Sequence, residues 1–157
     1  TLIWTTGVQG NTEAAACQLS ETERGHRLQA NEYMEAIGEE NHGIYVAGYV
    51  SGYIVPENGR PTPQIVEAAE QTGSTAAKNI IADIKGGEKT KFVGNYRGTL
   101  VSIGSGYAVG TVGKTKLSGF SATFMKHMVY LVYTFEIRSG HYFFKYINDQ
   151  LFHKGAI

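Results

Sequence analysis

The sequence has 157 residues, enough for a modest hydrophobic core. Its 14 basic and 14 acidic side chains balance, so no net field attracts nucleic acid, and an aromatic content of 11% argues against disorder. A single cysteine, Cys17, excludes a disulfide framework and a multi-cysteine metal site; we expect a small apolar residue there rather than a redox thiol.

The charges are unevenly distributed along the chain. Residues 1–113 carry an excess of acidic groups, and residues 114–157 carry an excess of basic groups. The chain begins at Thr1 and enters an apolar run without a start methionine or a charged leader. We therefore expect a piece of a longer protein.

Short apolar runs predict strands in the first third of the chain. Residues 1–5 are β-branched and aromatic, and residues 44–47 form a compact apolar run closed by Gly48. Between them, residues 31–37 show a weak helical periodicity. Glycines and prolines in residues 52–61 indicate a loop.

The clearest predicted element is a helix over residues 63–85. Thr62 is a suitable cap, and Gly86 follows the helix end. Gly73 inside the helix costs about 1 kcal/mol relative to alanine, so a neighbouring backbone or a ligand approaches it, or the cost is tolerated. The stripe that recurs every three or four residues is Ile65, Ala69, Thr72, Ala76, Ile80 and Ile84.

Glycines after residue 92 predict an antiparallel meander with strands at residues 99–103 and 107–112. We interpret the Gly-Ser-Gly sequence between them as a hairpin turn, because no helix follows it as a phosphate-binding loop requires.

Two apolar helices are predicted at residues 118–138 and 142–152. The longest apolar stretch, residues 128–135, is far shorter than the ~20 residues that span a bilayer. Aromatic residues beside lysines are typical of a helix that lies on anionic lipid. A core-facing helix with a basic solvent face explains the pattern equally well.

Several of these segments, in this order, resemble the C-terminal part of type II NADH dehydrogenases, which are FAD-dependent proteins of the pyridine nucleotide-disulfide oxidoreductase superfamily. Residues 2–8 resemble the strand that leaves the NADH-binding domain, and residues 27–34 resemble the extended segment after it. Residues 44–48 resemble the strand that returns to the flavin. The long helix resembles the one that carries the pattern A-Q-x-A-x-Q-x-G.

Two positions depart from the family. Tyr49 stands where the family has an aspartate that contacts the flavin, and a phenol supplies no carboxylate. Glu67 stands in place of a glutamine, either ionised or protonated as a hydrogen-bond donor. The resemblance implies FAD contacts at Gly48 and Tyr49, and quinone contacts at Glu67, Ala69, Gln71 and Gly73.

The implied architecture is an α+β fragment of a two-domain FAD- and NAD(P)-binding flavoprotein. Residues 1–43 would end the NADH-binding domain, residues 44–113 would complete the FAD-binding domain, and residues 114–157 would form amphipathic helices on an anionic membrane surface. The intact protein would pass electrons from NADH through FAD to quinone as a peripheral enzyme at the cytoplasmic face of the cell membrane. This chain would shape and attach the pocket without being catalytic alone.

Alternative hypotheses stay open. Tyr49 favours a non-catalytic self-associating or membrane-docking module, and a related quinone-linked oxidoreductase with another electron donor is a third hypothesis. A strand at residues 44–47 without its neighbours would expose an edge, which predicts a homo-oligomer or a strand-exchanged dimer. The five histidines lack metal-ligand spacing, so we expect no metal site, and the balanced charge predicts no nucleic-acid partner.

Overall fold

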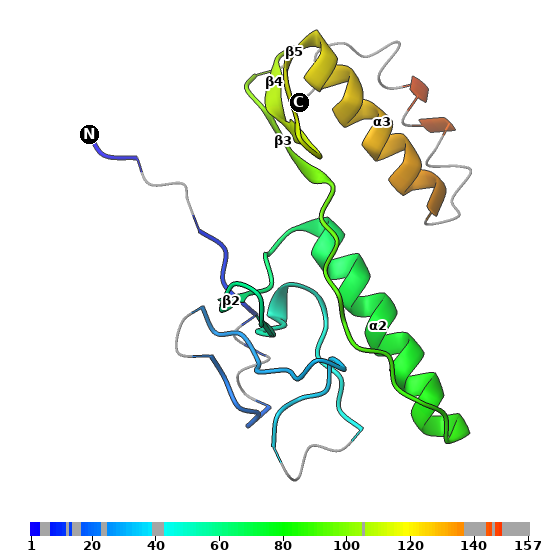
Figure 1. The fold of residues 1–157 in the computed structure, drawn as a ribbon. Coiled ribbons are helices and arrows are strands. Elements are labelled where there is room, and N and C mark those ends of the chain that lie inside the picture. Colours follow the sequence, from blue (N-terminus) through cyan, green and yellow to red (C-terminus); the bar gives the residue numbers. More distant parts are fainter. Residues whose placement is uncertain are drawn as a thin grey trace. The chain divides into compact units, whose positions relative to one another are not determined.

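The structure, a computed structural model (Figure 1), describes residues 1–3, 7–11, 13, 17–22, 25–38, 43–104, 106–136, 144–145 and 147–148. Its contacts form two compact units, Thr1–Tyr96 and Arg97–Ile157, which are described separately. The domain boundary expected after residue 113 falls at a turn between two strands of the second unit. The predicted α+β class is confirmed, with a long helix and an antiparallel meander.

The long predicted helix is confirmed as α2, Val66–Lys85. It begins later than expected because Thr62 is held outside it: the Thr62 hydroxyl donates to the Tyr53 carbonyl oxygen at 3.0 Å instead of capping the helix. Gly86 ends the helix in a left-handed conformation, φ 66°, and its N–H reaches the carbonyls of the last turn.

The buried face of α2 differs from the predicted stripe. Ile80 and Ile84 are exposed, 41% and 78%, whereas Asn79 is fully buried. The reason is a set of hydrogen bonds: Asn79 Nδ2 donates to the carbonyl oxygens of Tyr33 and Thr90 at 2.8 and 2.9 Å, and Asn79 Oδ1 accepts the Thr90 N–H at 2.8 Å. The buried residues of α2 are Ala68, Thr72, Ala76 and Asn79.

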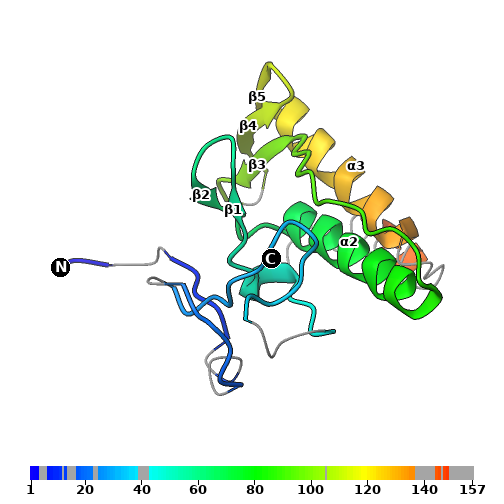
Figure 2. The same ribbon diagram turned by 60° about the horizontal axis from the view of Figure 1, so that its bottom comes forward.

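Residues 88–96, here called the return segment, run back alongside α2 (Figures 1 and 2). Phe92 in this segment is buried, and its ring meets the Tyr53 ring edge to face with 5.7 Å between centroids. The Phe92 N–H donates to the Glu32 carbonyl oxygen at 2.7 Å. The return segment thus joins α2 to the irregular part of the first unit.

The weak helical periodicity of residues 31–37 does not produce a helix, because the Asn31 side chain forms a turn there. Asn31 Oδ1 accepts the N–H groups of Tyr33 and Glu35 at 2.9 and 3.0 Å. The chain then reverses through Met34, whose φ is 65°.

The strand predicted at residues 44–47 is likewise absent: Tyr45 makes one isolated bridge to Glu35, and the 3-10 helix η1, Gly48–Val50, follows. The loop predicted after residue 52 contains a two-stranded hairpin, β1 (Ile54–Val55) and β2 (Arg60–Pro61). The strand predicted at residues 1–5 lies partly outside the described residues. The buried residues of the hydrophobic core around these segments are Leu28, Ala30, Met34, Ala36, Val46, Tyr53, Ala76 and Phe92.

The second unit is a meander, β3 (Gly98–Ser102), β4 (Ala108–Val112) and β5 (Thr115–Gly119), followed by α3 (Phe120–Glu136). The strands pair antiparallel in the order β3-β4-β5. The first two strands confirm the prediction; β5 was not expected, because its sequence lacks a clear apolar alternation. The end of the helix predicted to residue 138, and most of the one at residues 142–152, lie outside the described residues.

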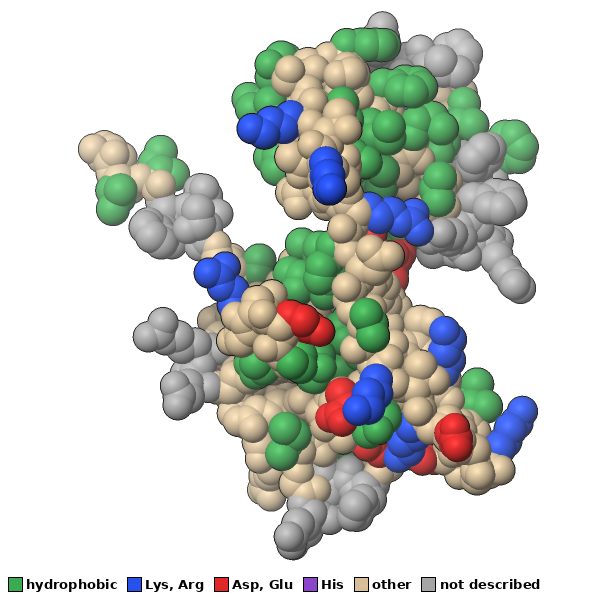
Figure 3. All heavy atoms as spheres, in the orientation of Figure 1, with side chains coloured by type: hydrophobic (Ala, Val, Ile, Leu, Met, Phe, Trp, Pro, Cys, Tyr) green, Lys and Arg blue, Asp and Glu red, His purple; other side chains and the backbone are tan. Residues whose placement is uncertain are grey.

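Exposed apolar side chains are frequent in the second unit, and Figure 3 shows hydrophobic side chains over much of its visible face. On α3, Phe120 and Phe124 are 83% and 55% exposed and stack with 6.3 Å between ring centroids. Within the described ranges, neither helix combines the length and apolarity needed to cross a bilayer.

Candidate functional site

Two of the residues implied by the resemblance, Gly48 and Ala69, meet in the first unit, where η1 contacts α2. Gly48 has a positive φ of 76°, and a Cβ built on it would lie 4.0 Å from the Ala69 Cβ. The Gly48 N–H donates to Thr72 Oγ1 at 2.9 Å. One implied flavin residue therefore lies directly against one implied quinone residue.

Thr72 connects η1 to α2. The sequence analysis did not predict this role, because it placed Thr72 in the apolar stripe of the helix. It is fully buried, and its hydroxyl lies within hydrogen-bond distance of the Ala68 and Ala69 carbonyl oxygens, at 2.8 and 3.0 Å. The Thr72 hydroxyl therefore donates its hydrogen to the backbone of its own helix and accepts the Gly48 N–H. Its signal in the sequence is a threonine with Ala68 and Ala76 one helical turn away on either side.

Tyr49 is 39% exposed. Its backbone carbonyl oxygen accepts a hydrogen bond from Gln64 Nε2 at 3.0 Å, which connects η1 to the residues just before α2. Its phenol supplies one donor and one acceptor where the resemblance implies a carboxylate.

Gln71 lies on a different side of α2 and is already bonded to the return segment. Its Nε2 donates to the Asn95 carbonyl oxygen at 2.7 Å, and its Oε1 accepts the Asn95 N–H at 2.9 Å. This amide therefore pairs with a peptide group as a neighbouring strand would.

Gly73 has open space around it: a Cβ there would meet nothing within 4 Å. Close approach by a neighbouring backbone is thus wrong for this glycine, which leaves the approach of a ligand or a tolerated cost. Glu67, one turn before Gln71, is half-buried. Burial first, and then the Glu67 charge, raise the pKa of Tyr96, whose buried hydroxyl has no hydrogen-bond partner among the described residues.

A charged cluster fastens the far end of α2. Lys89 Nζ lies 2.8 Å from Asp83 Oδ1 and 2.5 Å from Glu35 Oε1, and the Tyr45 hydroxyl donates to Asp83 Oδ2 at 2.5 Å. Hydrogen bonds from Asn31 and then from Lys89 lower the pKa of Glu35, and bonds from Lys89 and Tyr45 lower that of Asp83. The cluster joins the irregular loops, α2 and the return segment.

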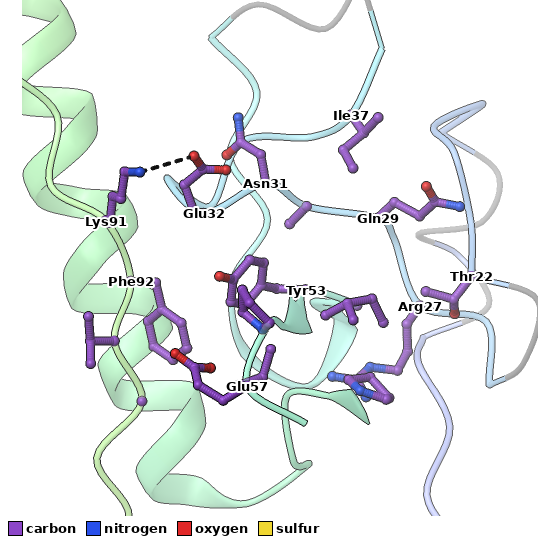
Figure 4. Close-up of a pocket in the computed structure, with 18 of the residues that line it drawn as sticks. Thr22, Arg27, Gln29, Asn31, Glu32, Ile37, Tyr53, Glu57, Lys91 and Phe92 are labelled. Atoms are coloured by element: carbon purple, nitrogen blue, oxygen red, sulfur yellow. Dashed lines mark ion pairs between the residues drawn. The ribbon is translucent and has the colours of Figure 1, made fainter. Parts of the chain in front are cut away.

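The first unit also contains an open hollow of about 1130 Å³ (Figure 4). Tyr53 and Phe92 form an aromatic part of its wall, and Lys91 pairs with Glu32 at 3.6 Å on one side. Arg27, 6% exposed, lines it elsewhere, with its Nη2 donating to the Thr62 carbonyl oxygen at 2.6 Å and to that of Ser51. Burial lowers the pKa of Arg27.

No histidine, cysteine, aspartate and glutamate side chains of the described residues gather in a group that could hold a metal ion. The Lys89 network contains two carboxylates, those of Glu35 and Asp83, and pairs both with the Lys89 ammonium group.

Comparison with known proteins finds relatives over most of this chain. No family model matches the chain. Type II NADH:quinone oxidoreductases of Staphylococcus aureus strains MSSA476, MW2 and NCTC 8325 are each 32% identical to it over 129 residues, which is 82% of this chain and 31% of the relative. The chain thus spans 31% of the length of these relatives. It is therefore related, over most of its own length, to the type II NADH:quinone oxidoreductases.

Proposed function

We propose that this chain is part of an NADH:quinone oxidoreductase of which it forms the C-terminal portion, and that η1 and the first half of α2 build a wall of its flavin and quinone pocket. The observation that carries the proposal is the contact of Gly48 with Ala69 and Thr72. Similarity to the Staphylococcus aureus enzymes over 82% of this chain supports it.

Small residues make this wall suitable for a flat ring. Ala69 and Gly73 are four positions apart on α2, so they lie one above the other on the same helix face. Gly73 has open space next to it, which leaves the helix backbone accessible to a ring system. We place the quinone against this face, with Glu67 as a polar group of the same turn.

The residues at η1 fit a flavin through their backbone rather than through a carboxylate. Gly48 adopts a left-handed conformation and donates its N–H to Thr72, and in this proposal the Tyr49 phenol replaces the aspartate that the resemblance implies. FAD bound there would supply the hydride and electron chemistry. The chain's own contribution is to position the ring and to exclude water from it.

In this proposal Gln71 acts on the pocket indirectly, through its hydrogen bonds to Asn95. Its two hydrogen bonds hold the return segment against α2, and a quinone contact would have to share or replace one of them. We therefore expect Gln71 to set the shape of the pocket wall.

Membrane attachment is proposed for the second unit. A stripe of exposed apolar side chains follows α3, and exposed Lys114 and Lys116 lie in the neighbouring turn and strand of the same unit. Such a surface favours peripheral binding to the anionic cytoplasmic face of the membrane over a core-facing helix. The stripe consists of Phe120, Phe124, Met128 and Val132.

The enzymatic proposal is tested on the full-length protein that contains this chain. We expect the purified protein to show flavin absorbance and to oxidise NADH only when a soluble quinone is present. Tyr49→Asp should strengthen flavin retention, whereas Tyr49→Phe should weaken it. A folded protein without flavin and without NADH oxidation would contradict the proposal.

A non-catalytic self-associating module is the second candidate function, favoured by the exposed apolar side chains of α2. Ile81 and Ile84 are 51% and 78% exposed. If this face joins two copies, Ile84→Lys should turn a homo-oligomer into a monomer in analytical ultracentrifugation, while Lys78→Ala should leave the oligomer unchanged. A wild-type chain that sediments as a monomer at high concentration would refute this candidate.

A further inference from the structure

Arg27 is a buried cation whose charge has no carboxylate partner among the described residues. It is 6% exposed, and its Nη2 donates to two backbone carbonyl oxygens. Its buried Nε–H has no hydrogen-bond partner in the part of the chain that the structure describes. The ion pairs of the described ranges involve other residues. Because a buried charge is costly unless it is paired, and buried polar groups are rarely unpaired, this guanidinium is expected to meet an anion.

The hollow next to Arg27 offers room for such an anion and for a body attached to it. Its volume, about 1130 Å³, lies slightly above the usual range of small-molecule sites. Arg27 and Tyr53 are linked through Thr62, whose carbonyl accepts from Arg27 and whose hydroxyl donates to the Tyr53 carbonyl oxygen at 3.0 Å. Figure 4 shows Arg27 on one side of the hollow, with the Tyr53 and Phe92 rings toward the other.

The remaining charges of the hollow favour a ligand with one negative charge. Lys91 is paired with Glu32 at 3.6 Å, which leaves Arg27 as the cation of the lining without a carboxylate. Glu57 also lines the hollow, so a second negative charge on the ligand would be repelled.

We propose that this hollow binds a monocarboxylate with a flat apolar body, whose carboxylate pairs with the Arg27 guanidinium and whose body lies along Tyr53 and Phe92. The apolar wall is extended by Ile54, Val55 and Pro61. This site is distinct from the Gly48 and Ala69 contact, and the inference does not depend on the proposed oxidoreductase function.

The test is calorimetric titration of this 157-residue chain with three probes: phenylacetate, its neutral analogue phenylacetamide, and inorganic phosphate. We expect saturable binding of phenylacetate, binding of phenylacetamide weaker by about tenfold or more, and no binding of phosphate in the same range. Arg27→Met should abolish phenylacetate binding, and Arg27→Lys should retain part of it. Arg60→Met is the matched control, because Arg60 is exposed on β2 and lies outside the lining of the hollow.

Several outcomes would overturn the proposal. These are equal binding of the acid and the amide, no binding of phenylacetate, preference for phosphate, or unchanged binding by a folded Arg27→Met variant. If circular dichroism shows that Arg27→Met does not fold, the comparison of acid with amide on the wild-type chain decides, together with Arg27→Lys. An equal loss of binding in Arg60→Met would show a general charge effect and would also contradict the assignment.

Discussion

Asn79 should be one of the most important polar residues for the stability of the first unit. It is fully buried on α2 and makes three hydrogen bonds, two to Thr90 in the return segment and one to Tyr33 in the irregular loops. Asn79→Ala removes all three and leaves a small cavity. Each bond contributes a net ~0.5–1.5 kcal/mol, and water can reach exposed Thr90, so we expect a loss of about 2–3 kcal/mol in the free energy of unfolding.

Urea denaturation followed by circular dichroism measures this loss. Lys78→Ala is the control, because Lys78 is exposed on the same helix and should change stability by less than about 0.5 kcal/mol. Asn79→Asp keeps an acceptor for the Thr90 N–H but loses the donor to both carbonyls, so it should be at least as destabilising at neutral pH as Asn79→Ala.

Hydrogen exchange localises the effect. The Phe92 N–H, bonded to the Glu32 carbonyl oxygen, should exchange faster in Asn79→Ala because the return segment loses its attachment to α2. A stability loss below about 0.5 kcal/mol, or unchanged Phe92 exchange, would refute the reasoning that Asn79 fastens the return segment.

Three further predictions follow from particular contacts. The pKa of Glu35 is lowered from 4.5 in the folded chain, so the stability that Glu35 contributes is present above pH 4.5 and is lost as the pH falls through the folded pKa. Lys89→Met should flatten this acid dependence of the denaturation midpoints between neutral and acidic pH. An unchanged slope would contradict the prediction. Gly73→Ala should raise the stability of α2 by about 0.5–1 kcal/mol in thermal denaturation, because the new alanine Cβ meets no described atom within 4 Å. The same variant should weaken quinone turnover in the full-length protein. A destabilised variant would reveal a contact absent from the structure. Phe124→Ser should reduce binding to anionic vesicles by about tenfold or more in flotation assays, because burying a Phe side chain contributes about 1.5–3 kcal/mol. Val101→Ser, at an exposed position of β3, should leave vesicle binding unchanged. Equal losses in the two variants would contradict a membrane role of α3.

Local sequence determined the elements whose pattern repeats within a few residues. The long helix, α2, was predictable because small and apolar residues recur at helical spacing and Gly86 ends it in a left-handed conformation. The first two strands of the meander were predictable because glycine-rich turns separate two β-branched runs. The resemblance also marked Gly48 and Ala69, which the structure brings into contact.

Tertiary structure decided the features that depend on partners far along the chain. Asn79 turns the buried face of α2 away from Ile84 because its hydrogen-bond partners lie at residues 33 and 90, and Gln71 pairs with a backbone group at residue 95. The Asn31 turn replaces a predicted helix because one side-chain oxygen satisfies two N–H groups. Arg27 became a candidate site only when folding buried its guanidinium beside a hollow. Helical and strand periods are local properties of a sequence, whereas the partner of a buried polar group is chosen by the fold.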